Sequence, residues 1–142
     1  SFDRMLDDRG NTAVYLLYSL TRIRSIIRKI PLEESIQQVA EDYYKNNNFT
    51  IEHEKEIKLA KFIINFADII AEIVDDLYLH KLCGFLFQLC SVFSEFYEQC
   101  YVIQKIDNET KVFKHRVVLC EVTARIIEKS LEILGIKTVE KM

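Results

Sequence analysis

The feature that most constrains this chain is the scarcity of residues that interrupt a helix. Its 142 residues include three glycines and one proline, and most of the sequence has apolar residues at helical spacing. A sandwich or a barrel needs many turns, and turns are rich in glycine and proline. With 49% hydrophobic residues, the chain can bury a sizeable core without disulfides or metal. The sequence therefore predicts an all-α fold, a single helical bundle of about five to seven helices.

Five helical segments can be delimited from their apolar spacing and their end signals. They cover residues 13–28, 32–45, 54–77, 79–100 and 115–134. Gly10-Asn11-Thr12 is expected to precede the first helix as a break, and Pro31 to stop it. The third is expected to be kinked or divided between Asn65 and Asp68, and Gly135 to cap the last. No repeat or long linker divides the chain, so these helices should share one core.

Two shorter segments carry predictions of their own. Glu33 and Glu34 are expected in the first turn of the second helix, where carboxylates favour the helix dipole. Residues 104–114 are polar and charged without a helical period, which predicts an exposed loop or a short hairpin. Residues 136–142 remain as a tail after the last helix.

The overall charge gives no sign of a nucleic-acid binder. The formal net charge is −3 and the pI about 5.7, so contact with RNA has to come from a local patch. No stretch has the roughly 18 apolar residues of a membrane span, and the first residues carry no signal-peptide pattern. Four cysteines without a CxxC pair are typical of reduced thiols in an intracellular protein. A cytoplasmic location without a membrane partner is expected.

The residues that could carry chemistry form no catalytic motif. His53, His80 and His115 stand outside any nucleophile elbow or triad motif and are interpreted as surface histidines. His80 and Cys83 are three residues apart, but no second ligand pair has zinc spacing, so no metal site is expected. No glycine-rich phosphate loop occurs in the sequence. An independent enzyme is therefore the least supported class, and no cofactor is expected in this chain.

The first helix combines aromatic and cationic side chains. Tyr15 and Tyr18 lie one turn apart, and Arg22 lies a turn beyond, with Arg24, Arg28 and Lys29 following. Unstacked RNA bases gain on the order of 1–3 kcal/mol each on tyrosine or guanidinium planes, while Arg and Lys hold phosphates. Tyrosines at this spacing are more often core or rim packing, and arginines usually pair with surface acids. Chemistry alone leaves RNA binding and ordinary packing both open.

Four stretches of the sequence, taken in order, give a more specific signal. They are GNTAVYLLYSLTRIRSI from Gly10 to Ile26, LYLHKLC from Leu77 to Cys83, FSEFYEQCY from Phe93 to Tyr101, and Leu134-Gly135-Ile136 with a methionine as last residue. Together they resemble the C-terminal anticodon-binding domain, of DALR type, of eukaryotic cytosolic arginyl-tRNA synthetases, which are class I arginine–tRNA ligases. The resemblance covers essentially all of residues 1–142. Residues 1–10 are expected as a lead-in from a catalytic domain that lies outside this sequence.

The resemblance implies a helical bundle that receives the anticodon loop of tRNA(Arg) among aromatic and basic side chains. Residue by residue, it places in the anticodon site Tyr18, Arg22, Tyr101 and Met142, with Tyr15, Arg24 and Tyr97 as outer candidates. Thr138 and Lys141 depart from the family, in which proline and arginine are common before the last methionine. A bidentate arginine contact in the tail would thereby become a point charge.

The resemblance also implies what the whole enzyme does. Its catalytic domain would attach arginine to tRNA with ATP and Mg²⁺, while this domain recognises and positions the anticodon arm. The catalytic domain is then a partner, and membership of a multi-synthetase complex stays open. The alternative is a protein-interaction or scaffolding module, in which tyrosine and arginine anchor partner helices. The two hypotheses differ in whether Tyr18, Arg22 and Tyr101 converge on one open, positively charged face.

Overall fold

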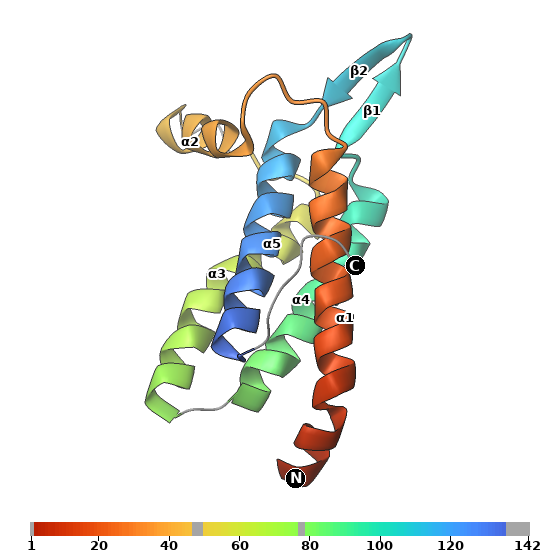
Figure 1. Ribbon diagram of the computed structural model, residues 1–142. Helices are drawn as coiled ribbons and strands as arrows, with labels where there is room; N and C mark the ends of the chain where they lie inside the picture. The colour runs from red at the N-terminus through yellow and green to blue at the C-terminus, as the bar shows by residue number, and fades with distance from the viewer. Residues whose placement is uncertain (1, 47–49, 77–78, 136–142) are drawn as a thin grey trace.

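The computed structural model describes the backbone of residues 2–46, 50–76 and 79–135, and the side chains of residues 13–46, 50–72 and 81–135. This part of the chain forms five helices and one hairpin (Figure 1). In order they are α1 (Phe2–Arg28), α2 (Ile36–Asn46), α3 (Glu54–Asp76), α4 (Leu79–Gln99), β1 (Ile103–Ile106), β2 (Glu109–Val112) and α5 (Lys114–Ile133). The predicted all-α bundle is confirmed.

Four long helices surround one core. α1, α3, α4 and α5 run along the length of the molecule, while α2 and the hairpin lie at the end opposite the N-terminus (Figure 1). The most extensive helix contacts join α3 with α4 and α1 with α5. The core includes, from these four helices, Leu16, Ile23, Leu59, Leu86, Phe93, Phe96, Ile127 and Leu131. Each such side chain contributes about 1.5–3 kcal/mol on burial, so the chain has a hydrophobic core of its own.

The first helix is longer than predicted. The expected break at Gly10-Asn11-Thr12 is wrong, because α1 runs without interruption from Phe2 to Arg28. A glycine inside a helix costs only about 1 kcal/mol relative to alanine, and a continuous helix keeps its backbone hydrogen bonds on both sides. At the other end, α1 stops before Pro31 as predicted.

The second helix begins later than predicted, at a serine cap. The Oγ of Ser35 accepts a hydrogen bond from the backbone N–H of Gln38 at 3.1 Å, and its carbonyl accepts one from Val39 at 3.0 Å. Serine followed three residues later by glutamine is a capping-box signature. Glu33 and Glu34 therefore lie in the turn before α2, and their predicted placement in its first turn is wrong.

α3 is one continuous helix, so of the two predicted alternatives between Asn65 and Asp68 the division is wrong, and the kink stays a prediction. Both side chains are exposed. A polar residue on the solvated face of an amphipathic helix leaves the backbone hydrogen bonds intact. The polar pair therefore marks the outer face of α3 and not an end.

The hairpin and the last helix end agree with the sequence. β1 and β2 pair antiparallel, which is the hairpin alternative of the prediction for residues 104–114. Asp107 and Asn108 turn the chain with φ of 49° and 68°, the left-handed conformation that a two-residue type I′ turn requires. Gly135 has φ of 75° and donates its N–H to the carbonyl of Glu132, as expected for a C-terminal cap.

The cysteines are thiols packed between helices. Cys90, Cys100 and Cys120 are buried, whereas Cys83 is only partly buried. Burial raises the pKa of Cys90 to about 11 and that of Cys120 to about 12, because a thiolate is poorly solvated inside the core. Since the thiolate is the reactive form, these buried thiols should be inert in the folded chain.

We expect a thiol-specific reagent at about pH 8 to modify one cysteine of the folded chain quickly and three slowly. The fast position is Cys83, and Cys83→Ala should remove the fast phase. The time course is followed with Ellman's reagent, and the same reaction in denaturant gives the total number of reactive thiols. Fast modification of all four thiols without denaturant would contradict the buried positions.

Candidate nucleic-acid interface

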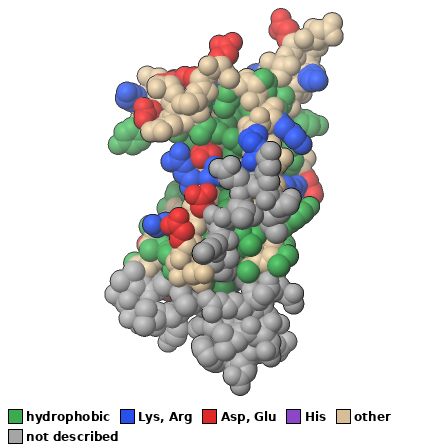
Figure 2. Space-filling model, in the orientation of Figure 1, with side chains coloured by type: hydrophobic (Ala, Val, Ile, Leu, Met, Phe, Trp, Pro, Cys, Tyr) green, Lys and Arg blue, Asp and Glu red, His purple; other side chains and the backbone are tan. Residues whose placement is uncertain are grey.

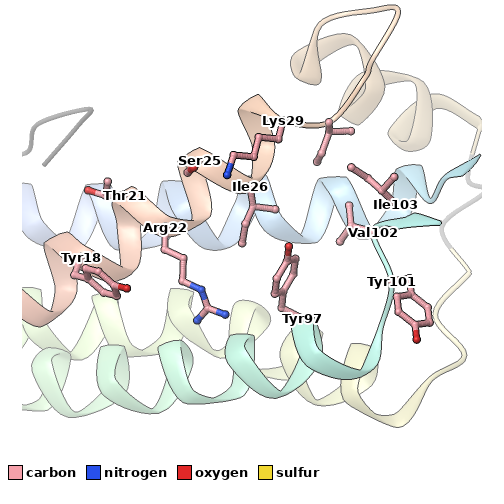
Figure 3. A pocket seen from close by; sticks show the side chains of 11 residues that line it. Tyr18, Thr21, Arg22, Ser25, Ile26, Lys29, Tyr97, Tyr101, Val102 and Ile103 are labelled. Carbon is pink, nitrogen blue, oxygen red and sulfur yellow. The ribbon is translucent and has the colours of Figure 1, made fainter. Parts of the chain in front are cut away.

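An open groove lies between α1 and the chain that leaves α4 (Figure 3). It encloses about 700 Å³. Three segments contribute to it: one face of α1, the last turn of α4, and the first residues after that helix. The side chains along it are Tyr18, Thr21, Arg22, Ser25, Ile26, Lys29, Ile30, Tyr97, Tyr101, Val102 and Ile103.

Helical spacing explains why α1 supplies so many of these side chains. Tyr18, Arg22 and Ser25 follow one another at intervals of four and three residues, which places them on one face of α1. Lys29 comes directly after the helix and continues this spacing, with its backbone N–H donating to the carbonyl of Ser25 at 3.3 Å. The opposite face of α1 is buried in the core, for example at Leu20. Packing of that buried face holds the groove face in place.

Four of the groove side chains form a row of flat surfaces (Figure 3). Tyr18 and Tyr101 lie at its two ends and are 64% and 62% exposed. Between them, the guanidinium carbon of Arg22 lies 5.6 Å from the centre of the Tyr97 ring, a cation–π contact. All four were predicted as site residues, and the structure brings them together on one open surface.

The groove is cationic although the chain is acidic. Arg22 and Lys29 lie in it, and none of the described residues that line it is acidic. Arg22 donates a hydrogen bond to the neutral hydroxyl of Ser94 at 3.2 Å, which leaves its charge uncompensated by that partner. On the face shown in Figure 2, Lys and Arg side chains lie near Asp and Glu side chains in several places. The groove is thus a local positive patch of the kind that the acidic composition requires of a nucleic-acid binder.

Two other predicted site residues lie outside this row. Tyr15 does not line the groove and stacks on Phe87, with ring centres 4.9 Å apart and planes inclined by 25°. Tyr15 stays 40% exposed, and its partial burial raises its pKa above the usual value for tyrosine. Met142 falls outside the described residues, so its prediction remains untested.

Arg24 faces α5 and not the groove. One terminal nitrogen donates to both carboxylate oxygens of Glu121 at 3.0 and 2.9 Å, and the other donates to Glu128 at 3.1 Å. Burial alone would lower the pKa of Arg24, but the hydrogen bonds to Glu121 and Glu128 outweigh it and raise the pKa. Two residues along a helix correspond to a rotation of about 200°. Arg22 and Arg24 therefore cannot share a face, a signal that the sequence already contained.

The sequence prediction left out several residues of the groove. Lys29 is in helical register with Tyr18 and Arg22, so periodicity could have included it. Val102 and Ile103 had no local signal, because they enter the groove only through the path of the chain after α4.

Two of the histidines interpreted as surface residues, His53 and His115, are partly buried at the starts of α3 and α5. The Nδ1 of His53 accepts the backbone N–H of Lys55 at 3.0 Å. The Nε2 of His115 lies 2.7 Å from a carboxylate oxygen of Glu56. The side chain of His80 lies outside those described.

Among the side chains that are described, no group of three or more His, Cys, Asp or Glu residues could hold a metal ion. No helix in the described ranges is long and apolar enough to cross a membrane.

A helical bundle with an open groove of tyrosines and cations is equipped to hold unpaired nucleic-acid bases. Residues 16–142 match the family model described as the DALR anticodon binding domain. The chain belongs to the DALR anticodon-binding domain family.

Similar proteins agree with this assignment. The whole chain is 49% identical to part of a cytoplasmic arginine–tRNA ligase from Xenopus tropicalis and 46% identical to part of that from Homo sapiens. It spans 22% of the length of each of these relatives. A crystal structure of arginyl-tRNA synthetase from Plasmodium falciparum matches the whole chain with a TM-score of 0.73 and 33% identity, over 23% of that protein. These matches confirm the resemblance found in the sequence.

The two arginines of α1 should differ in their effect on stability. Arg24→Gln should lower the free energy of unfolding by about 1–3 kcal/mol, because Glu121, with 8% of its side chain exposed, loses charged hydrogen bonds. Arg22→Gln removes the same charge from the same helix and should cost less than about 1 kcal/mol. Urea unfolding followed by far-UV circular dichroism measures both. Equal losses would contradict the separation of the two faces of α1.

Proposed function

We propose that this domain binds the anticodon loop of tRNA(Arg) as part of an arginine–tRNA ligase. The observation that carries the proposal is the convergence of Tyr18, Arg22, Tyr97 and Tyr101 in one open, cationic groove. Family membership and the names of the relatives support it. Attachment of arginine with ATP and Mg²⁺ then takes place in a catalytic domain outside this chain. The proposed location is cytoplasmic, because the relatives are named cytoplasmic enzymes.

The row of flat side chains suits bases that have left the helical stack. Tyr18 and Tyr101 present largely exposed rings at the two ends, each available to a base. Stacking of one base on an aromatic ring is worth about 1–3 kcal/mol. Arg22 lies between these rings. The Tyr97 ring beside the Arg22 guanidinium limits the orientations that the guanidinium plane can adopt. A guanidinium held in this way can donate two parallel hydrogen bonds to a base edge or a phosphate.

The sides of the groove separate two kinds of contact. Ile26, Val102 and Ile103 supply apolar surface beside the row, where water is excluded when a base is bound. Lys29 lies one helical turn beyond Ser25 and offers a mobile point charge that can follow a phosphate. Bases and backbone of a single-stranded loop can thus be held at the same time.

The net charge of −3 implies that the domain alone binds tRNA weakly. Much of the affinity of nucleic-acid complexes comes from phosphate neutralisation, and two groove cations supply little of it. The role of this domain is then selection and orientation of the anticodon arm, while contacts elsewhere in the enzyme supply the rest.

The alternative of a helical protein-interaction module is less well supported. A groove for a partner helix is lined by apolar anchors at helical intervals. This groove instead presents exposed tyrosine rings together with an arginine and a lysine. A single strand of nucleic acid matches both features, because its bases stack and its phosphates carry negative charge.

Binding of tRNA(Arg) to the chain should depend on the tyrosines at both ends of the row. Tyr18→Ala and Tyr101→Ala should each weaken binding by about 1–3 kcal/mol, roughly five- to 150-fold in Kd, because each removes a stacking surface. Changing the middle anticodon base of the tRNA should also weaken binding of the unaltered chain. Fluorescence anisotropy of labelled tRNA at low and moderate salt measures all three.

Tyr44 provides a matched control for these variants. It lies on α2, outside the groove, and is 90% exposed, so Tyr44→Ala should leave the affinity unchanged. The proposal that this groove reads the anticodon would be contradicted by one result. In that result, the unaltered chain, Tyr18→Ala and Tyr101→Ala all bind both tRNAs with the same affinity.

Lys29 should contribute through charge and not through base identity. Lys29→Gln should weaken binding to both tRNAs equally and should reduce the slope of log affinity against log salt by about 0.7–1. Lys129→Gln removes an equal charge from α5 outside the groove and should leave the slope unaltered. An effect of Lys29→Gln on one tRNA alone would contradict a phosphate contact.

A further inference from the structure

We propose that Arg116, anchored by the buried carboxylate of Glu56, is a positioning residue for the Tyr101 end of the groove. The inference rests on the proposed function of the groove and extends it to residues that do not line it. Arg116 lies in the first turn of α5 and Glu56 in the first turn of α3, so two helix ends meet behind Tyr101.

The guanidinium of Arg116 joins three segments of the chain. One terminal nitrogen donates a hydrogen bond to the backbone carbonyl of Tyr101 at 2.8 Å. The other donates to Glu56 Oε1 at 3.4 Å. The guanidinium carbon also lies 4.8 Å from the centre of the Phe113 ring, in a cation–π contact. Because the donors of arginine lie in one rigid plane, these three contacts together fix where the Tyr101 carbonyl can lie.

Glu56 is itself held firmly, so it can act as an anchor. Only 2% of its side chain is exposed. Its Oε1 accepts the backbone N–H of His53 at 3.3 Å, which is the return bond of a capping box at the start of α3. Its Oε2 lies 2.7 Å from Nε2 of His115. The carboxylate is therefore held by the backbone just before α3 and by Arg116, with His115 beside it.

Tyr101 is the groove residue that most needs such an anchor. It lies between the end of α4 and the start of β1, so neither a helix nor a strand holds its backbone. Its side chain is 62% exposed, which leaves few packing contacts to orient the ring. Next to it, the carbonyl of Val102 accepts the N–H of Phe113 at 2.9 Å. The position of the Tyr101 ring thus depends on a backbone that is held by hydrogen bonds from Arg116 and Phe113.

The physical benefit is preorganisation. A stacking platform that is already ordered loses less conformational entropy when a base binds to it. A buried ion pair adds little stability compared with well-packed apolar residues of similar size. Glu56 and Arg116 therefore contribute more to the position of the Tyr101 backbone than to the stability of the fold.

The first test uses Arg116→Met, which keeps much of the side-chain length over Phe113 and removes both hydrogen bonds. Binding of tRNA(Arg) should weaken about five- to tenfold, and the Phe113 amide should exchange its hydrogen faster. Arg125→Met is the matched control, because it removes the same charge and an ion pair to Glu121 from the same helix without touching Tyr101. Its affinity should stay within about twofold of the unaltered chain.

A double-mutant cycle shows whether Arg116 acts through Tyr101. If it does, Tyr101→Ala with Arg116→Met should bind tRNA as weakly as Tyr101→Ala alone. Fully additive losses would overturn the inference, because Arg116 would then act on tRNA independently. Should Arg116→Met fold poorly because the buried Glu56 has lost its arginine partner, Glu56→Gln with Arg116→Met removes the buried charge. That pair should show the same loss of binding and the same absence of additivity.

The outcomes separate this inference from the proposed function. If Tyr101→Ala weakens binding and Arg116→Met, alone or with Glu56→Gln, does not, the positioning role fails and the groove remains the site. If Tyr101→Ala leaves the affinity unchanged, the proposed use of that end of the groove fails, and the positioning role fails with it.

Discussion

The burial of one face of α1 is the constraint on which the rest of the site depends. Leu16, Leu20 and Ile23 are almost completely buried against the other helices. Their burial sets the rotation of α1, and the rotation decides which side chains reach the groove. Because α1 is one continuous helix, Tyr18, Arg22 and Ser25 are placed by the same packing, and Lys29 comes directly after its last residue. A shift of this buried face in the core would move all the α1 side chains that line the groove together.

The same rotation divides the charges of α1 between two tasks. Arg24 turns toward α5, where Glu121 and Glu128 neutralise it and join the two helices. Arg22 turns toward Tyr97 and Ser94, which carry no charge to oppose it. An acidic chain can therefore keep a cationic groove, because its carboxylates pair with cations elsewhere. Net charge alone says little about a surface when helices sort charges in this way.

Periodicity predicted the parts of the structure that local chemistry determines. The bundle, the hairpin alternative and the Gly135 cap follow from spacing, composition and backbone preference. The break at Gly10 was wrong because one glycine cannot overcome the hydrogen bonds of a long helix. The start of α2 was wrong because the Ser35 cap outweighs two acidic residues. Tyr18, Arg22, Tyr97 and Tyr101 were named through a family resemblance, whereas periodicity alone could have separated Arg24 from them.

The end of the groove at Tyr101 was beyond local prediction because distant residues build it. Glu56, Tyr101 and Arg116 meet only when the first turns of α3 and α5 pack behind the chain that leaves α4. No spacing of two, three or four residues connects these positions, so neither periodicity nor motif matching can find them. Tyr18 differs, since the packing of one whole helix against the core places it. One end of the groove therefore depends on a helix and the other on tertiary contacts, and the second is the end where substitutions outside the groove should alter binding.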